Sequence, residues 1–219
     1  MRNRKIPKNQ TTRHLLPIAC AALALSFAAS LAQAGHREQV TPPPVPTDLR
    51  VESGNKAFLK GHATGTQNYI CLPDGTGFKF VLFTPQATLF DEDGKQIITH
   101  FFSPNPDPDD AGTIRAAWQY RDTSTVWAGL VQPSSDPEFV EPNAVPWLLL
   151  ERKGSQDGPT GGDKLTDTTF IQRVNTSGGV APETGCESEA DVGRKEFVPY
   201  SADYFFYKKA HKYDGYGDY

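Results

Sequence analysis

Apolar and polar residues alternate along this chain with a period of two, rather than 3.6, from about residue 50 onward. Glycine, proline, asparagine and aspartate interrupt the alternation roughly every eight to twelve residues, which is typical of short strands joined by turns. The clearest strand segments are 67–72, 77–83, 87–91, 95–102, 114–120, 123–131, 145–151, 170–176 and 200–207. Because no window predicts a helix of three turns, the pattern indicates an all-β protein.

Two short stretches of the sequence predict particular features of the β-sheet, a central strand and a hairpin turn. AVPWLLLE, at residues 144–151, is apolar at neighbouring positions and predicts a central strand that is covered on both faces. DEDGK, at residues 91–95, predicts a hairpin turn in which Gly94 adopts a positive φ. Many short strands without helices are typical of two architectures. We therefore expect a single domain at residues 50–208, folded as a β-sandwich or a partly closed β-barrel.

The first 34 residues have the three parts of an export signal. A basic start precedes an apolar run at 15–31, and an AQA sequence that ends at Ala34 forms a small-residue cleavage pattern. We expect residues 1–34 to be a signal peptide, and the rest of the chain to be exported to the periplasm or the extracellular medium without a transmembrane anchor. A lipid anchor on Cys20 is the alternative, but Pro17 stands where such signals usually have leucine.

The segments that flank the expected domain are polar. Residues 35–49 are rich in proline and contain nothing that predicts burial, so we expect a disordered leader. At the other end, residues 209–219 are rich in tyrosine, glycine and aspartate, and we expect a mobile tail.

Removal of the signal peptide changes the charge of the chain. The whole sequence has 22 Lys and Arg against 26 Asp and Glu, and the signal holds five of the basic residues and none of the acidic ones. The remaining chain thus has 17 basic against 26 acidic residues, a net charge of −9. Nucleic-acid binding requires a basic stripe, whereas the basic clusters here are pairs such as Arg152-Lys153. We expect no nucleic-acid partner.

The cysteine content predicts one disulfide. Of the three cysteines, Cys20 leaves with the signal peptide. Cys71 and Cys186 then remain as an even pair in an oxidising compartment, where thiols of this kind are normally joined. We therefore expect an all-β domain with a Cys71–Cys186 bond.

Five segments carry a resemblance to a known family: QNYIC at 67–71, DEDGKQIITHFF at 91–102, AVPWLLLE at 144–151, IQRVNTSGGVAPETGC at 171–186 and VPYSADYFFY at 198–207. Together they resemble the domain of unknown function family 3455, which is found in exported bacterial and fungal proteins. The resemblance implies an exported β-rich domain and no established chemistry. The stretch 103–117 departs from the tryptophan-containing form of many members.

One histidine precedes a cluster of aspartates and raises the question of a metal site. His100 shares a strand face with Ile98 and Phe102, and Asp107, Asp109 and Asp110 follow in SPNPDPDD. Imidazole and carboxylates can bind a divalent metal such as Zn²⁺ if they converge. The alternative is a half-buried strand histidine followed by an acidic turn, with no cofactor.

A copper site is a second metal hypothesis, because cleavage after Ala34 would leave Gly35 and His36 at the new terminus. An α-amine, an amide and an imidazole can surround Cu²⁺ in a square plane. A disordered terminus without metal is the alternative.

Two groups of residues are candidates for ligand binding. Arg173, Asn175 and Thr176 precede the Gly178-Gly179 pair, where a ligand can approach the backbone, although a turn next to the disulfide loop needs the same glycines. Trp118 and Tyr120 share one strand face and can stack on a sugar ring, although core packing is the alternative.

Strong catalytic signatures are missing from the sequence. There is no G-x-S-x-G elbow, and the expected disulfide leaves no thiolate. GTGFKF, at residues 75–80, leads into a strand and not a helix, which excludes a dinucleotide-binding turn. We therefore expect a non-enzymatic domain that binds a ligand or associates with the envelope, with a glycan or another extracellular component as partner. A secreted hydrolase of polysaccharides or other polymers, with carboxylates as acid and base, is the alternative.

Overall fold

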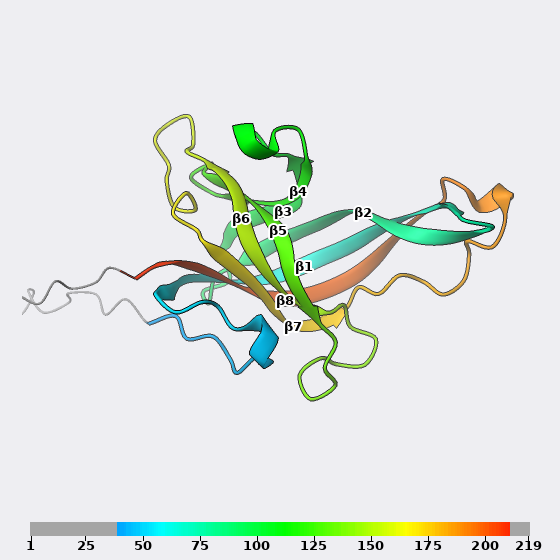
Figure 1. Cartoon of the computed structure of the whole chain (residues 1–219), viewed down its shortest axis with the longest axis horizontal. Coiled ribbons are helices and arrows are strands. Elements are labelled where there is room, and N and C mark those ends of the chain that lie inside the picture. Colours follow the sequence, from blue (N-terminus) through cyan, green and yellow to red (C-terminus); the bar gives the residue numbers. More distant parts are fainter. Residues whose placement is uncertain (1–38, 211–219) are drawn as a thin grey trace, which may run out of the picture. The chain divides into compact units, whose positions relative to one another are not determined.

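The computed structural model describes residues 39–210, which contain eight β-strands (Figure 1). The strands are β1 (Asn55–Asp74), β2 (Gly77–Phe90), β3 (Gln96–Pro104), β4 (Ile114–Tyr120), β5 (Thr125–Ser134), β6 (Trp147–Gln156), β7 (Phe170–Gly178) and β8 (Lys195–Lys209). Short 3₁₀ helices are η1 (Thr47–Leu49), η2 (Pro108–Asp110) and η3 (Glu189–Asp191). The expected signal peptide, the Gly35-His36 site and residues 211–219 of the expected tail lie outside the described residues.

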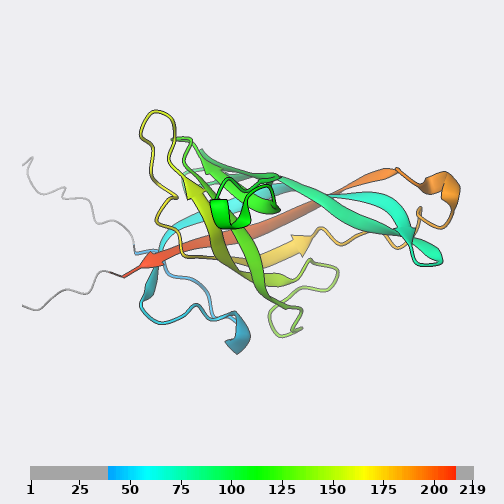
Figure 2. The same ribbon diagram turned by 45° about the horizontal axis from the view of Figure 1, so that its top comes forward.

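The sheet closes on itself. Each strand pairs antiparallel with the next strand in the sequence, and β8 pairs with β1 (Figures 1 and 2). Thr64, near the middle of β1, illustrates the closure because it faces Thr88 of β2 on one side and Ser201 of β8 on the other. The all-β prediction is confirmed, and the architecture is a fully closed barrel.

Several strands are longer than the sequence pattern predicted, β1 and β2 most clearly. β1 begins at Asn55, and the segments 77–83 and 87–91 belong to one continuous strand, β2. The start of β1 was missed because charged residues and glycines interrupt the alternation there. One of these glycines is required by packing, since a Cβ on Gly65 would overlap the carbonyl oxygen of Gln86 on the paired strand.

The barrel interior forms the first of two hydrophobic cores. Side chains that alternate along the strands point inward, and those of Leu89, Ile98 and Phe206 are fully buried there. Leu165, from the connection between β6 and β7, is fully buried in the same cluster. His100 also lies inside, stacked on the Trp118 ring.

A second core covers the outer face of β6, β7 and β8. Trp147 and Leu149 of β6 belong to it, whereas Leu150 belongs to the inner core and Leu148 packs against that core. The prediction that AVPWLLLE is covered on both faces is therefore correct. Val140, from the connection between β5 and β6, completes part of the cover.

The N-terminal part of the described chain supplies the rest of this cover and differs from the expected disordered leader. Val40 and Val45 pack against the outer core, and Leu49 in η1 is 0% exposed. The Leu49 carbonyl oxygen accepts a hydrogen bond from Gln172 Nε2 at 2.6 Å. Isolated apolar side chains in an irregular, proline-rich segment have no period, so the sequence pattern did not reveal that they are buried.

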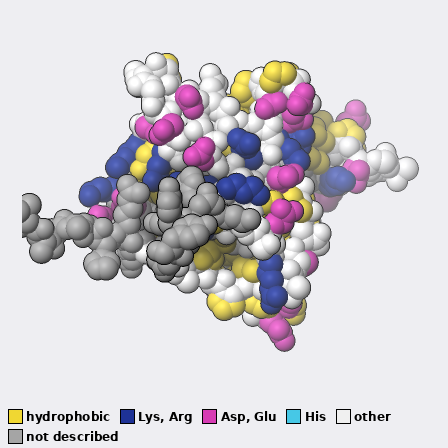
Figure 3. Space-filling model, turned by 60° about the vertical axis from the view of Figure 1, so that its left-hand side comes forward, with side chains coloured by type: hydrophobic (Ala, Val, Ile, Leu, Met, Phe, Trp, Pro, Cys, Tyr) yellow, Lys and Arg dark blue, Asp and Glu magenta, His cyan; other side chains and the backbone are white. Residues whose placement is uncertain are grey.

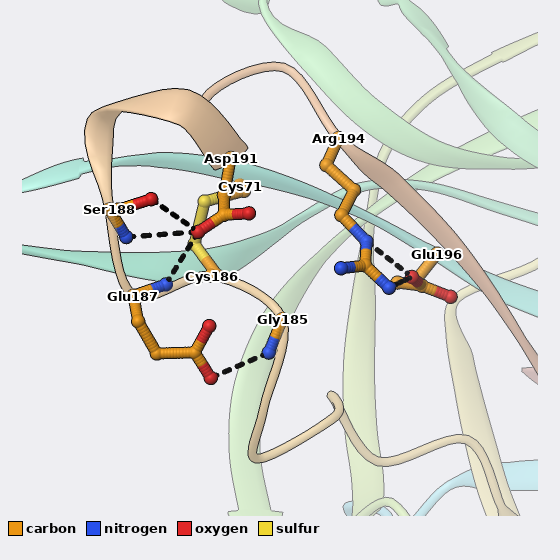
Figure 4. Close-up of a disulfide and its surroundings, with 8 residues drawn as sticks. All are labelled: Cys71, Gly185, Cys186, Glu187, Ser188, Asp191, Arg194 and Glu196. Carbon is orange, nitrogen blue, oxygen red and sulfur yellow. Dashed lines mark hydrogen bonds and ion pairs between the residues drawn. A yellow bond between two sulfur atoms is a disulfide. The ribbon is translucent and has the colours of Figure 1, made fainter.

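The predicted disulfide is confirmed and lies on an arm formed by the ends of β1 and β2. Cys71 in β1 is bonded to Cys186, with 5.5 Å between the Cα atoms and 115 residues between them in sequence (Figure 4). Backbone hydrogen bonds from Cys71 N to Arg194 O and from Gly193 N to Cys71 O, each 2.9 Å, hold the same loop. The loop that follows β7 is thus attached to β1 outside the barrel.

Removal of this bond tests its contribution to stability. We expect Cys71→Ser combined with Cys186→Ser to lower the free energy of unfolding by about 4 to 5 kcal/mol at most, because the bond closes a long loop in the unfolded chain. Denaturant unfolding of the variant and the wild type, followed by circular dichroism, measures the difference. An unchanged midpoint would contradict the expectation.

The outer core gives a second prediction. We expect Leu49→Ala to lower the free energy of unfolding by about 2 to 5 kcal/mol, because it opens a cavity under a fully buried side chain. Leu72→Ala is the matched control, since this leucine is 36% exposed on the arm, and its cost should be clearly smaller. Thermal or urea unfolding of both variants makes the comparison. If Leu49→Ala lowers the free energy of unfolding as little as Leu72→Ala does, residues 39–49 do not belong to the folded domain.

Candidate functional site

The barrel contains a cavity of about 250 Å³ that opens at one end. Every strand contributes to its wall, from Gln67 of β1 to Tyr204 of β8. His100 and Tyr204 line the cavity, whereas Ile98 and Phe206, two residues along the same strands, are fully buried in the inner core. The lumen is therefore filled toward one end and hollow toward the other.

Apolar side chains surround the opening. Leu82, Ile114 and Leu130 are 36, 58 and 57% exposed and line the cavity, and we call these three residues the apolar rim. Below them, Phe102 and Leu148 continue the apolar wall. Large aliphatic side chains that remain exposed around a hollow are typical of binding sites for apolar groups.

His100 lies in the cavity wall as a neutral group. Its ring stacks on Trp118 with 4.3 Å between centroids and an angle of 11°, and lies 5.3 Å from the Tyr204 ring. Because Nδ1 lies 2.9 Å from the carbonyl oxygen of Ala117, which can only accept, Nδ1 carries the proton and Nε2 is the free acceptor. Burial lowers the pKa of His100 to about 3, so the ring is uncharged at neutral pH.

Arg173 places a positive charge in the same cavity. The residue pairs with Tyr204 across the β7–β8 ladder and is only 8% exposed. Its Nε and Nη2 both donate to the carbonyl oxygen of Pro146, at 3.3 and 2.9 Å. Within residues 39–210, no carboxylate forms an ion pair with this guanidinium.

A further N–H donor in the wall is left without a partner. Trp118 Nε1 is buried and makes no hydrogen bond to any described residue, whereas the Gln67 side chain interacts with the Tyr200 hydroxyl. On the same face of β8, burial raises the pKa of Tyr200, whose hydroxyl lies 3.4 Å from that of Tyr204. The polar part of the cavity is therefore rich in donors.

A second arginine at the cavity is held by an ion pair. Arg115 donates from Nε and Nη2 to the two oxygens of Asp110, at 2.7 and 2.8 Å. Asn105 donates to the same carboxylate at 2.9 Å, and these bonds hold the pKa of Asp110 well below its usual range. The charge of Arg115 is thus already neutralised, in contrast to that of Arg173.

The residues of the metal hypothesis do not come together as a metal site. His100 is buried in the barrel wall, whereas Asp107, Asp109 and Asp110 lie in and beside η2 and bond to their own loop and to Arg115. No group of three or more His, Cys, Asp and Glu side chains between residues 39 and 210 is arranged to hold a metal ion.

The first group of ligand candidates divides between different places. Only Arg173 faces the cavity. Asn175 is exposed and donates to Asp203 at 2.9 Å, and Thr176 is buried and donates to the carbonyl oxygen of Val145 at 2.7 Å. Gly179 is required by packing, since a Cβ there would lie 2.8 Å from Tyr200 Cβ. The glycine pair serves the structure of the turn.

The aromatic candidates share one face, as predicted, but that face points into the barrel. Trp118 is 1% exposed and belongs to the inner core, where the His100 ring stacks on it, and Tyr120 packs against the same core. The guanidinium of Arg121 lies 5.5 Å from the Tyr120 ring centroid. Trp118 therefore lines the cavity and does not form a flat platform on the surface.

Several cavity residues were not found by sequence reasoning. Alternation in the strand 200–207 places Tyr204 on the same face as Tyr200, so the sequence carried a signal for it. Gln67, Leu130 and Leu148 carried none, because they come together only when the barrel closes.

The surface shows no single charge sign on the face drawn in Figure 3, where acidic and basic side chains are interspersed. In the part of the chain that the structure describes, no helix is long and apolar enough to cross a membrane.

Comparisons with known proteins agree with the resemblance noted above. Neither a curated protein nor a solved structure matches the chain. The model of a family described as "Protein of unknown function (DUF3455)" matches residues 52–208, which covers all eight strands apart from Lys209 at the end of β8. The chain therefore belongs to the DUF3455 family.

Proposed function

We propose that this protein is an exported binding protein that holds one small, largely apolar molecule in its barrel without changing it chemically. The observation that carries the proposal is the cavity of about 250 Å³, to which all eight strands contribute. Eight-stranded barrels commonly either fill their interior with side chains or hold one small ligand there.

The size and lining of the cavity match a molecule of about one ring. A dry cavity of roughly 150 Å³ lined by aliphatic and aromatic side chains is enough to bind benzene. The present cavity is larger, and most residues in its wall are apolar. It therefore has room for a ring or a short aliphatic chain that bears a polar substituent.

The chemistry of the wall favours binding over hydrolysis. Glycoside hydrolysis requires two carboxyl groups on either side of the bond that breaks. Of the described residues that line the cavity, none is Asp or Glu. His100 is the titratable base within it, and with a pKa of about 3 it is a poor base at neutral pH.

A glycan partner has less support than a small apolar ligand. Sugars bind by stacking on exposed aromatic faces, but Trp118, Trp127 and Trp147 are all buried. The cavity is bounded by the apolar rim, which offers little hydrogen bonding to sugar hydroxyls.

Export is part of the proposal and is supported by the disulfide. The Cys71–Cys186 bond is of the kind that persists in the periplasm and outside the cell, and is rare in reducing compartments. The expected signal peptide at residues 1–34 points in the same direction.

Obstruction of the cavity tests the proposed function. We expect Ala116→Phe to abolish binding of one-ring probes, because Ala116 lines the cavity and a phenyl group there would occupy it. The probes are toluene, benzamide and benzoate, and the readouts are tryptophan emission and the shift in the midpoint of thermal unfolding. Ala190→Phe, at an exposed position in η3, is the matched control and should bind like the wild type. The proposal fails if none of the probes binds the wild type, or if both variants bind equally.

The neutral state of His100 predicts a pH dependence. Its pKa is about 3 in the folded chain and about 6.5 when unfolded, so the unfolded state takes up the proton first as the pH falls. This contribution to stability is complete above pH 6.5 and is lost as the pH falls toward 3, by up to about 1.4 kcal/mol per pH unit.

Urea unfolding between pH 7 and 4 measures this effect. We expect His100→Phe to reduce the slope of the unfolding free energy against pH. Equal slopes in the variant and the wild type would show that folding does not lower the pKa of His100.

A further inference from the structure

We infer that the molecule held in the barrel carries a single carboxylate, which binds to Arg173. The inference rests on the proposed function and specifies the class of ligand. The observations behind it are one guanidinium without an acidic partner and the buried Trp118 N–H group without an acceptor, both in the wall of the cavity.

The guanidinium of Arg173 is a buried charge without an acidic partner among the described residues. A buried charge is costly unless it is paired, and a guanidinium that is 8% exposed keeps little contact with water. Its Nε and one proton of Nη2 are used by the Pro146 carbonyl oxygen, which is neutral. The Nη1 side makes no hydrogen bond within residues 39–210, so two parallel N–H groups remain for a planar acceptor.

The neighbouring polar groups favour an acceptor as well. Trp118 Nε1 is a donor without a partner, and an unsatisfied buried donor costs free energy that a ligand oxygen would recover. A carboxylate only accepts hydrogen bonds, so it matches a wall in which donors are left over. A ligand amine would add a second positive charge beside Arg173.

The net charge of the wall sets the charge of the ligand. Two arginines and no carboxylate line the cavity, but Arg115 is already neutralised by Asp110. One positive charge therefore remains, which a monoanion balances and a phosphate dianion would exceed. The apolar rim lies toward the solvent, so the apolar body of the ligand points outward and its carboxylate inward.

Ligand charge tests the inference in the wild-type protein without any substitution. Benzoate and hexanoate provide a ring and a chain with the same carboxylate, benzamide is the neutral counterpart of benzoate, and benzylamine is the cation. We expect benzoate or hexanoate to bind at least tenfold more tightly than benzamide, measured by calorimetry at neutral pH, and benzylamine to be the weakest. Preference for the ring or the chain shows which body the cavity accepts.

Arg173→Met then tests the residue itself, because it keeps most of the unbranched apolar stem of the side chain and removes the charged guanidinium. We expect benzoate affinity to fall at least tenfold while benzamide affinity stays within about twofold. Arg50→Met, at an exposed arginine outside the cavity, is the matched control and should change neither value.

The outcomes separate the two ideas. If benzamide or toluene binds the wild type as tightly as benzoate does, the inference that the ligand carries a carboxylate is wrong. The proposed binding function would remain intact. Unchanged benzoate affinity in Arg173→Met would overturn the role of Arg173. If no probe binds the wild type, the proposed function fails together with this inference.

Discussion

The pairing of β1 with β8 is the constraint on which the rest of the structure depends. It joins the ends of a meander of eight strands, so that every inward-facing side chain shares one lumen. Without this pairing, Gln67 and Tyr204 would lie at opposite edges of an open sheet, and the cavity would have no wall between them. The same pairing orders the start of β1 and the end of β8, which the outer core covers through Phe205 and Ala57.

Closure explains why one protein contains both a filled core and a hollow. The barrel has the same strands along its length, and the difference lies in which side chains point inward at each level. Toward one end these are Leu89, Leu165 and Phe206, which interdigitate. Toward the other, small residues such as Ala116 and Ala128 line the wall together with Arg173 and His100, and space remains. A polar group in such a place must be satisfied from within, as His100 is by Ala117, or by something that enters.

The sequence predicted the features that depend on neighbouring residues and missed those that depend on closure. Period two identified most strands, the strand face shared by Ile98 and His100, and the double cover of AVPWLLLE, because these are local patterns. The counting of cysteines after removal of the signal identified the disulfide. By contrast, the convergence of Gln67, Trp118 and Arg173 brings together residues of β1, β4 and β7, and no spacing in the sequence encodes it. The burial of Leu49 was missed for a similar reason, since its partner Gln172 is 123 positions away.

The position of β8 as the last strand has a consequence for how the chain acquires its structure. This strand provides residues to both cores and hydrogen bonds to β1, the strand that is made first. Contacts between such distant parts of a chain form slowly, because a long loop must be closed before they contribute any stability. The barrel therefore closes only after β8 has been synthesised. The cavity is completed in the same late step, because β8 both pairs with β1 and supplies Tyr204 to the wall.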